Sequence, residues 1–139
     1  MPVSNIPNPM EITLKNLQKK TPIPRGKILK ATKAAFRKLK VKQSDLSIVF
    51  VGTKRMRAIN KKYLSHDYAA DVLTFDFGDA CGEIIICPHV ARVNAKAHQI
   101  STENEIIYYV IHGILHLAGF DDHKPCDILQ MRRMEKKML

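Results

Sequence analysis

Cysteine is scarce in this 139-residue chain, and long apolar runs are absent from its sequence. The cysteines are Cys81, Cys87 and Cys126, an odd number without a C-x-x-C pair, which argues against a disulfide framework and against a cysteine-based zinc site. No stretch approaches the roughly 20 apolar residues of a membrane span, and residues 1–9 lack the apolar core of a secretory signal. These absences predict a reduced, cytoplasmic protein with no membrane association and no disulfide-linked partner.

Acidic residues are scarce in the N-terminal half. Residues 1–62 contain 16 Lys/Arg against two acids, Glu11 and Asp45, a balance of +14, whereas the remainder contains 7 against 11, a balance of −4. The whole chain carries +10. Any single lysine run can be a solvated helix face. The imbalance as a whole favours a polyanionic partner, nucleic acid before an acidic membrane surface.

Hydrophobic periodicity predicts a flexible leader over residues 1–9 and a single domain over residues 10–139, long enough to bury a core. Met56, Ile59, Asn60 and Tyr63 mark the inner face of the second helix, and Thr102 with Glu105 has the spacing of a capping box. The expected elements are strands at 11–17, 45–51, 72–75 and 84–87, and helices at 24–39, after Gly52-Thr53, at 88–98, at 102–118 and from 126 onward. This order predicts an α+β fold around one small sheet.

The helix expected at 102–118 is apolar nearly all round, which places it in the core. His112 and His116 are four residues apart on it and therefore leave the same face. Gly119 is a stop signal, and a short acidic turn then leads to His123. Two ligands on a helix and one on the returning loop form a three-histidine metal site whose fourth position is open, as in catalytic zinc sites. The site is thus expected at the end of a buried helix.

Three neutral imidazoles leave the charge of a zinc ion unneutralised, which lowers the pKa of bound water from about 15.7 to about 7. The pair His112 and His116 alone could instead be satisfied core histidines; His123 favours the metal site. The related zincin motif H-E-x-x-H carries a glutamate as general base. Gly113 takes that position here, which argues against peptide hydrolysis.

The segment HGILHLAGFDDH, residues 112–123, resembles the H-G-x-L-H-L-x-G-Y/F-D-H signature of the YbeY family of metal-dependent endoribonucleases. Residues 59–63 (INKKY) are similar to the family's L-N-x-x-Y, residues 71–75 (DVLTF) to its D-V-L-S-F, and residues 82–88 (GEIIICP) to its G-D/E-I-x-I-x-P. The resemblance covers residues 45–139 in the same order. It implies an α+β fold with a small four-stranded mixed sheet packed with about five helices. It also implies one Zn²⁺ per chain, held by His112, His116 and a third histidine.

The same resemblance implies cleavage of single-stranded RNA in rRNA processing, near the 3′ end of the small-subunit rRNA, and a part in ribosome biogenesis and quality control. The implied partners are single-stranded rRNA and the small subunit with its assembly factors. We expect lysines of the first two helices to hold the RNA backbone, and the RNA-binding residues named for the site are Arg55, Arg57, Lys61 and Lys62 of the second helix.

Two positions depart from the family pattern. Six residues separate His116 from His123, where the family has five, and Asp122 occupies the expected slot. We predict His123 as the third ligand because a loop can absorb one residue; the Asp122 carboxylate is the alternative, since zinc also accepts oxygen. Leu64 follows Tyr63 where the family commonly has an arginine, and Arg57 or Arg55 would replace that arginine.

The sequence assigns no general base; Asp121 and Asp122 are candidates by their nearness in sequence alone. Two other functions stay open. One is a non-catalytic, zinc-containing ribosome-assembly factor that binds rRNA. The other is a zincin-like metallohydrolase of another substrate, which Gly113 disfavours.

Overall fold

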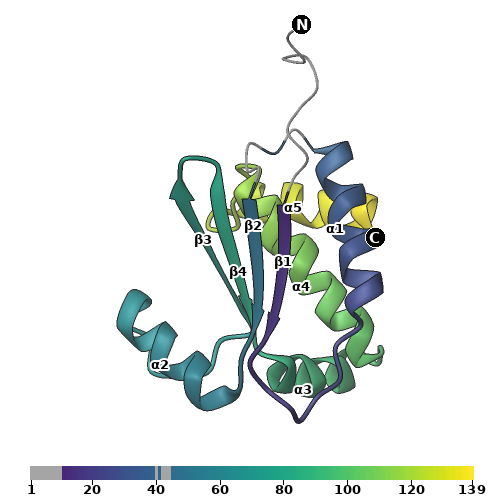
Figure 1. Ribbon diagram of the computed structural model, residues 1–139. Coiled ribbons are helices and arrows are strands. Elements are labelled where there is room, and N and C mark those ends of the chain that lie inside the picture. Colours follow the sequence, from purple (N-terminus) through teal and green to yellow (C-terminus); the bar gives the residue numbers. More distant parts are fainter. Residues whose placement is uncertain (1–10, 40, 42–44) are drawn as a thin grey trace, which may run out of the picture.

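The computed structural model describes residues 11–39, 41 and 45–139, so the leader predicted over residues 1–9 lies outside the described residues. Strands and helices follow the order expected from the sequence (Figure 1). Their bounds are β1 Glu11–Asn16, α1 Arg25–Lys38, β2 Asp45–Phe50, α2 Thr53–Leu64, β3 Val72–Gly78, β4 Cys81–Ile86, α3 Pro88–His98, α4 Thr102–Leu117 and α5 Pro125–Met138.

The four strands form one mixed sheet in the order β1-β2-β4-β3. β1, β2 and β4 are parallel, and β3 pairs antiparallel with β4 at an edge of the sheet. Asp79 and Ala80 turn the hairpin between β3 and β4 with positive φ angles of 50° and 62°, as a tight two-residue turn requires. The pairing register shifts between Asp76 and Gly78, which makes Phe77 a β-bulge. The predicted α+β class with a four-stranded mixed sheet is confirmed.

One face of the sheet is covered by α4, with α1, α3 and α5 packed around that helix (Figure 1). Tyr109, Ile111 and Ile114 of α4 are buried against Ile84 and Ile86 of β4 in the main core. Gly113 allows the close approach of helix and sheet, because a Cβ there would lie 2.9 Å from the Ile84 Cδ1 atom. The predicted core position of this helix is confirmed.

The opposite face of the sheet carries a smaller cluster under α2, in which Met56 packs with Val49, Leu73 and Ile85. Met56 and Asn60 are buried as expected. The prediction for Tyr63 is wrong: its side chain is 59% exposed, because it lies in the last turn of α2. Beyond α2 this face is open over β3.

Two local predictions on the helices are also wrong. The N-cap of α4 is Ser101, whose Oγ accepts a hydrogen bond from the Asn104 amide at 3.0 Å. Glu105 does not form the expected capping box. Its side chain is buried, with a carboxylate oxygen 3.0 Å from His98 Nδ1.

In the described part of the chain, none of the helices is both long and apolar enough to cross a bilayer.

Candidate metal centre

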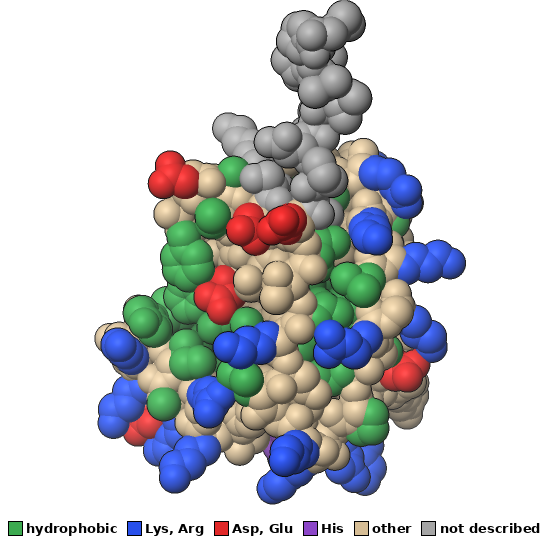
Figure 2. All heavy atoms as spheres, in the orientation of Figure 1, with side chains coloured by type: hydrophobic (Ala, Val, Ile, Leu, Met, Phe, Trp, Pro, Cys, Tyr) green, Lys and Arg blue, Asp and Glu red, His purple; other side chains and the backbone are tan. Residues whose placement is uncertain are grey.

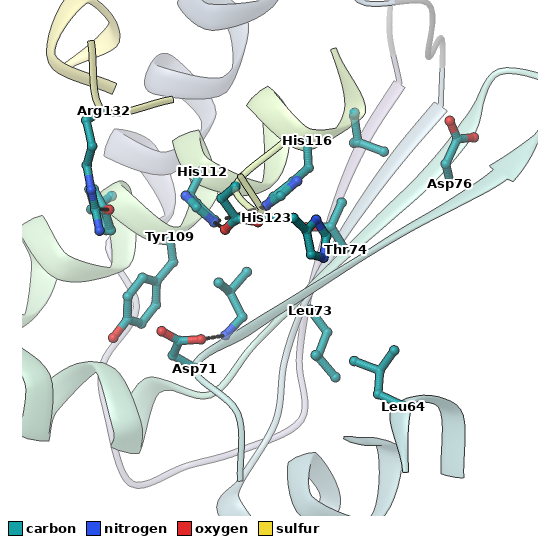
Figure 3. A pocket seen from close by; sticks show the side chains of 14 residues that line it. Leu64, Asp71, Leu73, Thr74, Asp76, Tyr109, His112, His116, His123 and Arg132 are labelled. Atoms are coloured by element: carbon teal, nitrogen blue, oxygen red, sulfur yellow. Dashed lines mark hydrogen bonds and ion pairs between the residues drawn. The ribbon is translucent and has the colours of Figure 1, made fainter. Parts of the chain in front are cut away.

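His112 and His116 leave α4 on one face and direct their Nε2 atoms at each other, 3.1 Å apart. The helix ends at Leu117, and Gly119 turns the chain with a φ of +99° that favours glycine. This turn brings Asp122 back to the histidines, with its Oδ2 atom 3.4 Å from His112 Nε2 and 3.5 Å from His116 Nε2. Figure 3 shows both histidines leaving α4 toward β3.

The three atoms form a nearly equilateral triangle that fits a metal ion. A tetrahedral zinc ion with bonds of about 2.05 Å has neighbouring ligand atoms roughly 3.3 Å apart. The observed separations of 3.1, 3.4 and 3.5 Å match that spacing. Two imidazole nitrogens and one carboxylate oxygen are also donors that zinc accepts. This group of His112, His116 and Asp122 can therefore hold a metal ion.

His123 is placed differently from its predicted role. Its Nδ1 is hydrogen-bonded to the Asp121 carboxylate, and its side chain is 82% exposed. The Asp121 carboxylate raises the pKa of His123 and is the main cause of that shift. Among the described residues, His123 groups with Asp121 and Asp122, whereas the histidine pair of α4 groups with Asp122 alone. The structure thus brings the alternative ligand, Asp122, to the two histidines.

Glu135 of α5 contacts the Nδ1 atom of His112, the ring nitrogen that is not part of the triangle. Its Oε2 lies 2.7 Å from His112 Nδ1, and its side chain is 3% exposed. A carboxylate that accepts the Nδ1 proton fixes the tautomer and leaves Nε2 as the ligand atom. Burial lowers the pKa of His116, and the neighbouring His112 adds to that effect, so His116 is neutral and able to bind a metal.

Arg132 lies one turn of α5 before Glu135, and its guanidinium donates to the Tyr108 hydroxyl at 2.5 Å. The same guanidinium is 3.5 Å from Glu135 Oε1. Burial, and then the hydrogen bond to Glu135, raise the pKa of Tyr108, so this hydroxyl stays protonated. Tyr108 in turn stacks beside His112, with ring centroids 6.1 Å apart. These contacts join α5 to the metal group.

The metal group opens into a cleft of about 590 Å³ between α4, α5 and the free edge of β3 (Figure 3). Among the described residues, Arg132 is the one arginine or lysine that lines it. Leu64, which stands where the resemblance implied an arginine, lines the side formed by α2. The cleft is lined further by Asp71, Val72, Leu73, Thr74, Asp76, Tyr108, Tyr109, Leu117 and His123.

The predicted RNA contacts of α2 lie outside this cleft. Arg57 pairs with Asp67 at 2.7 Å on the surface. Arg55 lines a separate hollow with Lys19 and Lys20 of the segment after β1. The structure therefore does not bring either arginine to the metal group as a replacement for the missing one.

Sequence reasoning missed Glu135, Arg132 and Tyr108. Glu135 had a usable signal, because it stands four residues after the apolar Met131 and therefore on the same face of α5. A lone acid on such a face is either neutralised or paired, since an unpaired buried charge is costly.

Three comparisons with known proteins agree. The family described as "Endoribonuclease YbeY" matches residues 13–139. Endoribonuclease YbeY of Elusimicrobium minutum is 37% identical over 100 residues, covering 66% of this chain and 70% of its own. That of Chloroherpeton thalassium is 34% identical over 123 residues, covering 86% and 87%. The solution structure of TM1509 from Thermotoga maritima is similar with a TM-score of 0.63 and 28% identity, covering 92% of this chain and 86% of that one.

Proposed function

The chain belongs to the YbeY endoribonuclease family, and from that premise we propose that it is a zinc-dependent, single-strand-specific endoribonuclease of rRNA processing. Its proposed substrate is the 3′ region of the small-subunit rRNA, bound on the ribosomal small subunit together with the assembly factors of that subunit. The proposed process is ribosome biogenesis and quality control. Its proposed location is the cytoplasm.

The observation that carries the proposal is the triangle of His112, His116 and Asp122 at the base of an open cleft. A zinc ion on these three residues would supply a Lewis acid for a phosphoryl oxygen and lower the pKa of a bound water. Glu135 keeps His112 in the tautomer that exposes Nε2. Asp122 replaces His123 in this proposal, because its oxygen lies within 3.5 Å of both ring nitrogens.

Arg132 supplies the positive charge that the position of Leu64 lacks. Its guanidinium lines the cleft beside the metal group and is 63% exposed, with donors left for a phosphate. A guanidinium there binds a phosphodiester and stabilises the charge that develops on its oxygens during cleavage. Arg55, Arg57, Lys61 and Lys62 would hold the RNA backbone farther from the reacting bond.

Cleavage of a single-stranded rRNA fragment tests the proposal. The wild-type protein should cut the fragment, the chelator-treated protein should not, and zinc should restore cutting. His116→Ala should be inactive in each condition because it removes one corner of the triangle. Cleavage that persists in both the chelator and the His116→Ala variant would contradict a metal-dependent nuclease.

Zinc analysis of two neighbouring variants tests the third ligand. Asp122→Ala should lose bound zinc, whereas His123→Ala should retain it, because the exposed His123 ring contacts Asp121 rather than the histidine pair. The reverse result would return the third-ligand role to His123 and remove Asp122 from the site.

One observation favours a second candidate function. Leu64 lines the cleft where relatives of this motif carry an arginine, and a weak or absent catalytic step would leave an rRNA-binding assembly factor with a structural zinc. Salt-sensitive RNA binding without cleavage, in zinc-loaded wild-type protein, would select this second function.

A further inference from the structure

Three aromatic rings form a row on the open face of the sheet, which we term the aromatic ladder: Tyr63, Phe75 and Phe77. The ring centroids of Tyr63 and Phe75 are 5.6 Å apart, edge to face. Those of Phe75 and Phe77 are 6.0 Å apart, with planes only 2° from parallel. The rings come from the end of α2 and from alternate residues of β3, so the row runs along the edge strand.

The ladder is exposed although its rings are apolar. Phe77 is 63% exposed and Tyr63 is 59% exposed, while Phe75 between them is half-buried. Phe77 occupies the β-bulge, a device that re-aims a side chain relative to a regular strand. Leu64, which follows Tyr63 in the sequence, is also exposed and adds apolar surface at the end of α2. Figure 2 shows hydrophobic side chains gathered over β3 and the adjoining end of α2.

Positive charge borders the ladder. Helix α2 carries five Lys/Arg residues and not one acid between Thr53 and Leu64. The Lys62 ammonium group lies 5.2 Å from the centroid of the Tyr63 ring. In Figure 2, Lys and Arg side chains lie below the hydrophobic patch, where Figure 1 places α2. Exposed rings flanked by cations suit a chain whose bases stack and whose phosphates pair with ammonium and guanidinium groups.

The ladder is continuous with the metal cleft. Leu64 and Leu73 line the cleft. Leu64 follows Tyr63 in the sequence, and Leu73 lies two residues before Phe75 on β3. β3 is an edge strand, so no further strand separates the open face from the cleft among the described residues. A polynucleotide that leaves the cleft over the edge of β3 therefore meets the ladder directly.

We propose that the aromatic ladder is a stacking platform for unpaired bases of single-stranded RNA, whose backbone is held by the cations of α2. The proposal rests on the proposed function, because it concerns the same substrate outside the cleft. It also gives a physical reason for single-strand preference, since a base-paired duplex buries the base faces that the rings would contact.

The absence of tryptophan from the chain allows a direct test. Phe77→Trp puts a single indole at the exposed end of the ladder, and Val93→Trp puts one at an exposed position of α3, 56% exposed in the wild type. Both are introduced into the His116→Ala background to prevent cleavage. Each protein is titrated with a single-stranded oligoribonucleotide and with an abasic oligomer of equal length and charge.

The indole at position 77 should be quenched by the oligoribonucleotide and much less by the abasic oligomer, while the indole at position 93 responds to neither. Phe77→Ala should weaken binding of the base-bearing oligomer by about 5- to 150-fold, the range of one lost base–aromatic stack, and leave abasic binding unchanged. If the wild type and Phe77→Ala each bound the two oligomers with the same affinity, the proposed platform would be overturned.

Three further outcomes separate this proposal from others. A wild-type protein that cleaves RNA, with an unchanged KM in Phe77→Ala, would remove the platform and leave the nuclease standing. Base-dependent quenching of the Phe77→Trp indole, together with a wild-type protein that never cleaves, would do the reverse. A dimer that dissociates in Phe77→Ala, with RNA affinity unaltered, would assign the ladder to contacts between copies and overturn the proposal.

Discussion

At the scale of single residues, the metal centre depends on a carboxylate that touches no metal. Glu135 is almost fully buried, and its Oε2 atom accepts from His112 Nδ1 at 2.7 Å. Such a partner raises the basicity of the ligating ring and holds its orientation. Its effect should therefore be visible in metal affinity more than in the integrity of the fold.

Glu135→Gln should lower the zinc affinity by about 10- to 100-fold, because an amide oxygen is a weaker acceptor for the Nδ1 proton of His112 than a carboxylate. Zinc competition with a chromophoric chelator measures this change, and Glu103→Gln, an exposed acid of α4, serves as the control. If Glu135→Gln lowered the melting temperature of the metal-free protein but left the zinc affinity unaltered, Glu135 would have a structural role only.

Arg132→Ala should reduce kcat/KM for RNA cleavage by up to about 10²-fold with the zinc content unchanged, because an exposed guanidinium contributes less than a buried donor. Arg132→Lys should recover only part of the loss, since an ammonium group cannot contact two phosphate oxygens in parallel. Arg133→Ala is the matched control: the neighbouring arginine is exposed but does not line the cleft. Equal rates for Arg132→Ala and Arg133→Ala would exclude Arg132 from the reaction.

The histidine pair could be predicted from the sequence, whereas the position of the third ligand could not. Helical geometry alone puts His112 and His116 on one face. The loop after Gly119 has no such periodicity, and the choice between Asp122 and His123 depends on how the chain turns at a positive φ. Glu135 reaches the site through tertiary packing of α5, which spacing along the chain does not express.

At the scale of elements, the site depends on how closely α4 approaches β4. Ile84 fills the space beside Gly113 so completely that a Cβ atom would lie within 3.0 Å of three of its side-chain carbons. Ile84 itself is fully buried. The glycine that follows His112 is thus required by packing, in addition to removing the acid of the zincin motif.

Gly113→Ala should destabilise the protein by about 1–3 kcal/mol, because overpacking against Ile84 outweighs the helix preference for alanine. Gly26→Ala in α1 is the control: its Cβ would meet nothing within 4 Å, so it should be neutral or stabilise by up to about 1 kcal/mol. Urea denaturation of both metal-free variants measures the difference. A stabilised Gly113→Ala variant would contradict the tight contact.

Most elements could be predicted because their periodicity and their tertiary surroundings agree. The alternation in β2 and the apolar stripe of α4 each correspond to a buried face. The sequence did not determine the cap of α4 or the outward position of Tyr63. Both lie at helix ends, where neighbouring side chains compete for the same role and periodicity no longer discriminates.

At the scale of the whole molecule, the two basic helices lie on opposite sides of the sheet. α1 packs in the core beneath one face, and α2 lies over the other. A single RNA strand that leaves the cleft over β3 follows α2 and not α1. Their lysines should therefore contribute unequally to RNA binding, although both helices are strongly basic, with six Lys/Arg in α1 and five in α2.

Lys61→Ala and Lys62→Ala should each reduce the slope of log affinity against log salt by about 0.7, the share of one phosphate contact with a single strand. Lys30→Ala and Lys33→Ala, at exposed positions of α1, should leave the slope unchanged. Filter binding over a series of salt concentrations measures all four variants. A larger change for the α1 lysines would move the path of the RNA to the other side of the sheet.

The order of these parts along the chain has a consequence for synthesis. The cationic helix α2 leaves the ribosome well before α4 and α5, which supply both metal-binding histidines, Arg132 and Glu135. A growing chain can therefore touch the rRNA around it before it can hold a metal. Translation would thus present the cationic helix first and the group that can hold a metal ion later.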